Sequence, residues 1–149
     1  MGVEALIRWK NGELGQVPPD RFIRVSEGNG MIIDIGRWVI DQALHDLSDI
    51  NRHHYCQSLQ LSINVSVRQL QENGFTERLS GSLLRYEFPA NQLTLEITEG
   101  IFIDDLQYLI PVLHKIRGLG VKLSMDDFGT GYSSLSLLKQ LPVDELKID

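Results

Sequence analysis

The chain has 149 residues, with 14 lysines and arginines against 20 aspartates and glutamates, and its formal net charge is −6. Its 42% hydrophobic and 23% charged residues are typical of a globular domain and exclude a disordered segment. The acidic balance argues against a protein that coats DNA. No apolar run approaches the roughly 20 residues of a membrane span, and the first residues lack the apolar region of a signal peptide. Cys56 is the single cysteine, so an internal disulfide is excluded and a reducing, cytoplasmic location is predicted.

Short strand-like segments alternate with helical patterns along the chain. The predicted strands are Glu4–Trp9, Leu59–Val65, Leu93–Ile97, Val121–Asp126 and Glu145–Asp149. The predicted helices are Ile32–Leu47, one marked by Leu79, Leu83 and Leu84, one over Leu106–Ile116, and a short one over Leu135–Leu138 capped by Ser133 or Ser134. Alternating strands and helices indicate parallel βα units, and we therefore predict an α/β fold.

The spacing of the strands points to part of a barrel. From Asn64 to Glu96 is 32 residues and from Glu96 to Asp126 is 30, each close to one βαβ repeat. The chain begins and ends inside predicted strands, whereas a complete (β/α)8 barrel takes about 250 residues. We therefore expect residues 1–149 to be a piece of a larger domain with about five parallel strands.

Each predicted strand alternates between apolar and polar positions. The polar face carries Glu4 and Arg8 with Leu6 between them, then Ser62, Asn64, Thr94, Glu96, Lys122, Ser124, Asp126, Glu145, Lys147 and Asp149. One interpretation is an amphipathic sheet with one wet face. Parallel sheets seldom leave a face bare, so the second interpretation places this face inside a barrel, with an active site at the carboxyl ends of the strands.

Five short motifs stand on these strands and the turns that follow them. They are Glu4-Ala5-Leu6-Ile7-Arg8-Trp9, Asn64-Val65-Ser66, Glu96-Ile97-Thr98-Glu99, Asp126-Asp127-Phe128-Gly129-Thr130-Gly131-Tyr132-Ser133-Ser134-Leu135, and Lys147-Ile148-Asp149. Their identity and order resemble the EAL domain family, bacterial phosphodiesterases that cleave cyclic di-GMP. The resemblance covers the whole chain and implies a TIM-like barrel whose first strand is antiparallel. By that resemblance the chain lacks the first strand and the last two.

The resemblance also implies a role for individual residues. The residues that match metal ligands are Glu4, Asn64, Glu96 and Asp126, with Asp127 bridging to or orienting a second metal. Lys147 matches a lysine that positions the attacking water or balances charge, which makes Glu4, Asp127 and Lys147 the expected catalytic group. Arg8 matches a contact to a ligand phosphate, beside Leu6 in the same substrate-binding motif, and Glu99 matches a glutamate that steadies the loop after the aspartate pair.

The chemistry of these residue types agrees with the resemblance. A phosphodiester is anionic and resists attack, and two divalent cations about 3.5–4 Å apart overcome that resistance. Oxygen ligands of this kind suit Mg²⁺ or Mn²⁺, whereas zinc favours histidine and cysteine. The adjacent carboxylates of Asp126 and Asp127 would repel each other without such cations. We therefore expect two Mg²⁺ or Mn²⁺ ions in each site.

The resemblance predicts hydrolysis of cyclic di-GMP to the linear dinucleotide pGpG in bacterial signalling. The alternatives are a non-catalytic receptor for the same dinucleotide and a protein-interaction module. The resemblance further allows a homodimer, a flanking sensor or GGDEF domain, and a membrane tether outside these residues.

Several isolated features have competing interpretations. Asp127-Phe128-Gly129 resembles a kinase motif, but the chain has no Gly-rich nucleotide loop and no His-Arg-Asp catalytic loop. Gly129-Thr130-Gly131 is more consistent with a flexible turn than with a phosphate loop. His53-His54 is expected in a polar surface connector, and Cys56 as a small residue near a strand. Trp9 and Trp38 are expected to pack the sheet against a helix.

Overall fold

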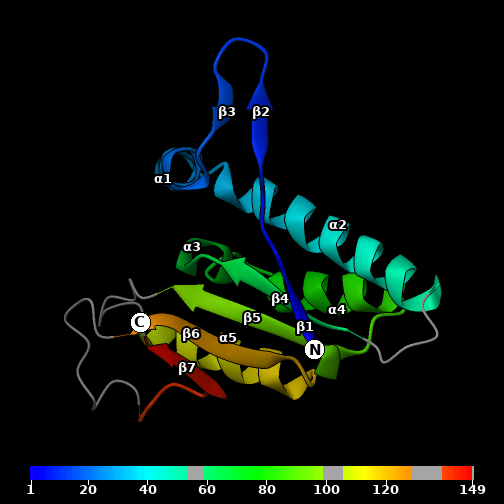
Figure 1. The fold of residues 1–149 in the computed structure, drawn as a ribbon. Helices are drawn as coiled ribbons and strands as arrows, with labels where there is room; N and C mark the ends of the chain where they lie inside the picture. Colours follow the sequence, from blue (N-terminus) through cyan, green and yellow to red (C-terminus); the bar gives the residue numbers. More distant parts are fainter. Residues whose placement is uncertain (54–58, 99–105, 129–138, 149) are drawn as a thin grey trace.

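Residues 1–53, 59–98, 106–128 and 139–148 are described by a computed structural model, and five strands in this part form one sheet (Figure 1). Side by side they are β1 (Gly2–Ala5), β4 (Gln60–Val65), β5 (Leu93–Thr98), β6 (Lys122–Phe128) and β7 (Glu145–Ile148). All neighbouring pairs are parallel. Each strand is added on the same side as the one before, which is the order of a barrel arc and not of a doubly wound sheet.

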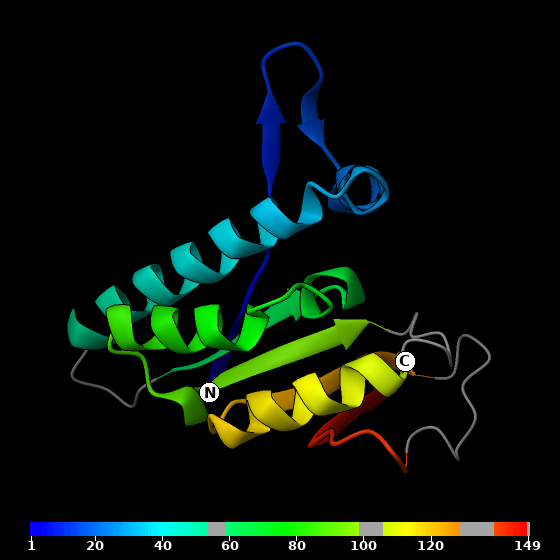
Figure 2. The same cartoon turned by 180° about the vertical axis from the view of Figure 1, so that it is seen from behind.

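Three long helices cover one face of this sheet (Figures 1 and 2). They are α2 (Ile32–His53), α4 (Phe75–Arg85) and α5 (Leu106–Gly118), while the short α3 (Val67–Leu70) follows β4 and the 3-10 turn η1 (Ala90–Gln92) precedes β5. Their buried residues recur at helical spacing, and the apolar strand residues pack on them. This core includes Leu44, Leu47, Ile63, Leu79, Leu93, Leu95, Ile97, Leu109, Leu113, Ile116 and Leu123. Burying this shared apolar surface is the main force that holds helices and sheet together.

The predicted α/β fold is confirmed, and four of the five predicted strands end within two residues of the observed bounds. The prediction that His53 lies in a connector is wrong, because α2 continues to His53. The last turn of α2 is polar, so the repeat of buried apolar residues stops at Leu47, before the helix ends at His53. An ion pair of 3.0 Å between Arg52 and Glu87 and a 2.8 Å contact of His53 Nδ1 with the Asp49 carbonyl oxygen accompany this turn.

The first predicted strand is wrong in its second half. β1 ends at Ala5, and the chain then leaves the sheet for an antiparallel hairpin of β2 (Trp9–Asn11) and β3 (Gly15–Val17), followed by α1 (Pro19–Asn29) (Figure 1). The Asn11 side chain accepts hydrogen bonds from the backbone N–H groups of Glu13 and Leu14 at 2.8 and 3.0 Å, and Gly15 has a φ of +69°. This local turn chemistry overrides the alternating pattern.

The tryptophan prediction is wrong for Trp38, and for Trp9 it holds for the two-stranded hairpin and not for the five-stranded sheet. Trp38 lies on α2 with 58% of its surface exposed. Trp9 is 41% exposed and makes an edge-to-face contact with Phe22 of α1, with ring centroids 5.8 Å apart. Neither ring is buried between the five-stranded sheet and a helix. The hydrophobic periodicity of a sequence places a residue on one face of a helix or strand, but it does not show whether another element covers that face.

Candidate active site

Polar side chains from all five parallel strands occupy the sheet face opposite the helices. Asn64 of β4 and Glu96 of β5 are register partners, Glu4 of β1 is aligned with Ser62, and Asp126 of β6 is aligned with Thr98. Glu4, Asn64, Glu96 and Asp126 each lie in the second half of their strand, towards its carboxyl end. The strand pairing therefore places together residues that are about 30 positions apart in the sequence.

Glu96 and Lys147 form the central ion pair of this face. Lys147 Nζ lies 2.5 Å from Glu96 Oε1, and the side chain of Glu96 is 2% exposed while that of Lys147 is 39% exposed. The other carboxylate oxygen, Glu96 Oε2, is buried and has no hydrogen-bond partner among the described residues. A buried charged oxygen without a partner costs free energy, so this atom is positioned to receive a cation or a hydrogen-bond donor.

Ser124 is a member of this face that the sequence motifs did not identify. It is aligned with Glu96 on one side and with Glu145 on the other, and it is fully buried. Its Oγ, like Glu96 Oε2, has no hydrogen-bond partner in the described part of the chain. The alternation of polar and apolar residues placed Ser124 on the polar face, but Ser124 belongs to none of the five motifs, so the sequence did not mark it as a site residue.

Glu4 and Asn64 are joined by a hydrogen bond. Asn64 Nδ2 donates to Glu4 Oε1 at 2.8 Å, across a sequence separation of 60 residues. Both side chains are exposed, unlike that of Glu96. The bond orients two of the predicted ligands towards each other at the edge of the sheet.

The pKa of Lys147 shows that the acidic residues converge. Its hydrogen bond to Glu96 is the largest effect and raises this pKa above the ordinary value of 10.5, while burial opposes the rise. The negative charges of Glu96, Asp126 and Glu4 each add a smaller increase. Three predicted ligands are thus close enough for their charges to act on one ammonium group. Lys147 is consequently protonated at neutral pH.

This pKa shift predicts a loss of stability at alkaline pH. A lysine whose folded-state pKa exceeds its unfolded value contributes stability that is complete below pH 10.5 and is lost as the pH rises through the folded value. We expect the melting temperature of the metal-free protein to fall in that range. The Lys147→Arg variant, which stays charged, would fall less. Thermal melts between pH 8 and 12 measure the difference, and identical curves for the two proteins would contradict it.

Asp144 anchors the strand that carries Lys147. Its N–H donates to the Leu123 carbonyl oxygen at 2.8 Å, and its Oδ2 accepts from the Leu123 N–H at 2.9 Å. Its Oδ1 lies 2.8 Å from Arg117 Nη2 of α5. Because Asp144 directly precedes β7, these bonds set the alignment of β7 on β6. A shift of one residue would turn Lys147 to the opposite face.

We expect Asp144→Ala to lower the free energy of unfolding by about 2 kcal/mol and to speed hydrogen exchange of the β7 amides, since two side-chain acceptors are lost. Asp144→Asn keeps an acceptor for the Leu123 N–H and loses only the partly exposed ion pair with Arg117, so its loss should be about 1 kcal/mol or less. Denaturant unfolding and amide exchange measure both effects. Unchanged exchange in the alanine variant would contradict this anchoring role.

Leu6 and Arg8, the predicted substrate-binding residues, lie outside the strands. Arg8 is exposed, and its Nη1 donates to the Ile7 carbonyl oxygen at 2.8 Å. Both residues line a cavity of about 250 Å³ that Asn64 also lines. The structure thus places them beside one predicted metal ligand, although no direct contact from Arg8 to the carboxylates is among the described interactions.

Several predicted features fall outside the described residues. They are Glu99, His54, Cys56, Gly129-Thr130-Gly131, the helix of Ser133 to Leu138, Asp149 and the side chain of Asp127, whose backbone belongs to β6.

The donor set suits a hard divalent cation. Glu4, Asn64, Glu96 and Asp126 offer carboxylate and amide oxygens, and the partnerless Glu96 Oε2 is a ready donor. Within residues 1–53, 59–98, 106–128 and 139–148, however, no three acidic, histidine or cysteine side chains are already gathered as a metal cluster. The residues fit the chemistry of Mg²⁺ or Mn²⁺, and binding would draw the carboxylates closer together.

No helix among the described residues is long and apolar enough to cross a membrane.

Five parallel strands in sequential order, with polar residues towards their carboxyl ends, place the chain in the class of α/β proteins built like a TIM barrel. The EAL domain family profile matches residues 1–149, and the chain belongs to that family. The resemblance inferred from the motifs is thereby confirmed, together with the TIM-like α/β fold of solved EAL domains.

Two curated relatives come from Pseudomonas aeruginosa. MucR, a bifunctional diguanylate cyclase/cyclic di-GMP phosphodiesterase, is 37% identical over 150 residues that cover 100% of this chain and 22% of MucR. NbdA, a cyclic di-GMP phosphodiesterase, is 39% identical over 147 residues that cover 99% of this chain and 19% of NbdA. The solved MucR phosphodiesterase in complex with c-di-GMP is similar with a TM-score of 0.88 and 38% identity, over 99% of this chain and 60% of that one. The chain spans about a fifth of the length of these curated relatives.

Proposed function

We propose that the protein is a metal-dependent phosphodiesterase that hydrolyses cyclic di-GMP to the linear dinucleotide pGpG. The observation that carries the proposal is the buried Glu96, which is paired with Lys147 through one oxygen and has its second oxygen without a described partner. Membership of the EAL domain family and the activities named for MucR and NbdA support it.

Glu4, Asn64, Glu96 and Asp126 would hold Mg²⁺ or Mn²⁺, together with Asp127, which follows Asp126 directly in the sequence. The chemistry that such ions supply at a phosphodiester is polarisation of the phosphoryl oxygens and activation of a water for in-line attack. Hard oxygen ligands favour these ions over zinc.

The remaining site residues act on charge and position. Lys147 is held protonated by its hydrogen bond to Glu96 and supplies a fixed positive charge beside the carboxylates. Arg8 and Leu6 line the cavity next to Asn64, where a guanidinium can bind an anionic phosphodiester and an apolar side chain can contact a base. The positive charges of Lys147 and Arg8 offset the repulsion that the net charge of −6 would exert on an anionic substrate.

The test is turnover of cyclic di-GMP with Mg²⁺ or Mn²⁺, using the protein that carries these residues in their natural sequence context. We expect the linear dinucleotide to appear and Glu4→Ala to abolish its formation, because Asn64 then loses its partner and the site loses a ligand. Glu13→Ala, which removes an exposed carboxylate from the hairpin turn, is the matched control. Full activity of Glu4→Ala would refute the assignment of the site.

A second candidate is a cyclic di-GMP receptor without catalysis. Leu6 and Arg8 line a cavity beside Asn64, where a guanidinium can bind an anionic dinucleotide whether or not turnover follows. Binding of cyclic di-GMP in a calorimeter, without release of linear product under the same metal conditions, would support the receptor over the enzyme.

The proposal extends to the setting of the protein. The bifunctional relative MucR supports a neighbouring diguanylate cyclase domain of the GGDEF type. A homodimer and a cytoplasmic location are proposed from the sequence analysis alone. Sedimentation with and without cyclic di-GMP measures the oligomer directly.

A further inference from the structure

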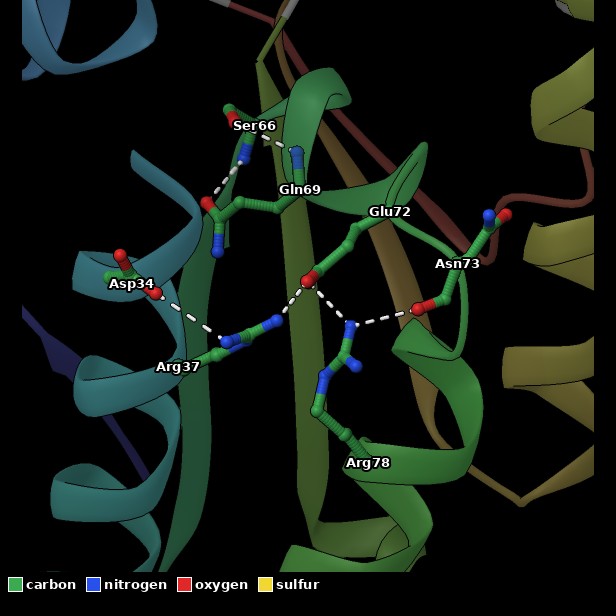
Figure 3. Close-up of polar contacts among 7 residues, drawn as sticks. All are labelled: Asp34, Arg37, Ser66, Gln69, Glu72, Asn73 and Arg78. Carbon is green, nitrogen blue, oxygen red and sulfur yellow. Dashed lines mark hydrogen bonds and ion pairs between the residues drawn. The ribbon is translucent and has the colours of Figure 1, made fainter. Parts of the chain in front are cut away.

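A partly buried helix cap closes the carboxyl end of β4. Ser66 directly follows this strand and is the N-cap of α3, and its Oγ accepts a hydrogen bond from the Gln69 N–H at 3.3 Å. In return, Gln69 Oε1 accepts from the Ser66 N–H at 3.0 Å (Figure 3). Reciprocal bonds of this kind are common at helix starts, where they satisfy donors that otherwise lack partners.

The unusual feature is what the Gln69 side chain packs against. Gln69 is 5% exposed, and its amide lies against Gly36 in the second turn of α2. A Cβ at position 36 would lie 1.7 Å from Gln69 Nε2 and 2.4 Å from Gln69 Cδ. Glycine inside a helix costs about 1 kcal/mol relative to alanine, and this close approach is the physical reason for a glycine here.

Neighbouring ion pairs hold α2 in place over this contact. Glu72, three residues after Gln69, bridges Arg37 of α2 and Arg78 of α4, with 2.5 Å between Glu72 Oε2 and Arg78 Nη2 (Figure 3). Both arginines are partly exposed, so each pair contributes little stability on its own. Together they limit how far α2 can move away from Gln69.

The cap acts on a predicted metal ligand. Asn64 lies two residues before Ser66, and Val65 between them is 2% exposed in the core. Gly36, Gln69, Leu6, Arg8 and Asn64 all line the same cavity of about 250 Å³. Holding the Ser66 N–H therefore fixes the strand end from which the Asn64 amide reaches Glu4 Oε1 at 2.8 Å.

We propose that Gln69, seated on Gly36, is a positioning residue that holds the Asn64 amide in place for the metal site. The metal part of this inference rests on the proposed function, while the hold on Asn64 does not. Residues that orient metal ligands typically change metal affinity 10- to 100-fold when they are replaced. A helix cap with no such role would change stability alone.

The experiment compares Gln69→Ala and Gly36→Ala with two matched controls. Gln42→Ala removes an exposed glutamine from α2, and Gly81→Ala adds a Cβ in α4 where nothing lies within 4 Å. The readouts are the melting temperature, the affinity for Mn²⁺ and the NMR resonances of the Asn64 side-chain amide in the metal-free protein. We expect Gln69→Ala and Gly36→Ala to shift or broaden the Asn64 resonances and to weaken Mn²⁺ binding about 10-fold. The controls should leave both unchanged.

The double variant Gly36→Ala/Gln69→Ala separates packing from positioning. Removal of the Gln69 amide relieves the overlap with the new methyl group, so we expect the melting temperature to recover relative to Gly36→Ala. The Asn64 resonances and the Mn²⁺ affinity should stay altered. Unchanged Asn64 resonances in Gln69→Ala would overturn the proposal. If the unsubstituted protein binds no Mn²⁺, the proposed function fails, and the Asn64 resonances still decide the role of Gln69.

Discussion

Replacing Lys147 with methionine is expected to lower the free energy of unfolding of the metal-free protein by about 2–3 kcal/mol. The loss arises because the nearly fully buried Glu96 carboxylate then has no cation beside it. The usual cost of breaking a buried pair is about 3–5 kcal/mol, and the partial exposure of Lys147 reduces it. Denaturant unfolding in a chelator at neutral pH measures this quantity.

The reverse substitution should behave differently. In Glu96→Gln the remaining Lys147, whose side chain is 39% exposed, can turn its ammonium group to water, so the loss should be about 1 kcal/mol or less. Added Mn²⁺ should raise the melting temperature of Lys147→Met, since a cation can replace the missing charge. Equal losses for the two single variants would show that Glu96 is not the buried partner.

Glu96→Gln is expected to reduce turnover of cyclic di-GMP at least 100-fold, although it keeps the fold. The amide preserves the shape of the side chain but removes the negative charge that a divalent cation requires. The partnerless Oε2 would become part of a neutral group with far weaker affinity for Mg²⁺ or Mn²⁺. Initial rates across a metal titration measure both the loss of turnover and any rescue at high metal.

Glu77→Gln is the matched control, since it neutralises an exposed carboxylate in the first turn of α4. It should retain the rate and the metal dependence of the unsubstituted protein. A Glu96→Gln variant with normal turnover at low metal would remove Glu96 from the site and leave its pairing with Lys147 as a purely structural feature.

The predictable parts of this protein depend on local patterns. Strands β4, β5 and β6 alternate apolar and polar residues, and α2 repeats its buried residues at the helical period, so the faces of these elements follow from short stretches of sequence. The motifs around Glu4, Asn64, Glu96 and Lys147 were likewise visible in the sequence, and their order along parallel strands placed them at one edge.

Other features depend on contacts between distant segments, which no local pattern contains. Glu96 and Lys147 are 51 residues apart, and only the packed sheet makes one of them buried and the other half-exposed. The amino-acid sequence by itself determined the parallel α/β arrangement and the family. Hydrophobic periodicity is visible in short stretches of neighbouring residues, and the order of the motifs is read directly along the chain. The tertiary structure alone decided which polar groups are buried, which oxygens lack partners and why position 36 is a glycine, because burial and close approach exist only once separate elements pack together.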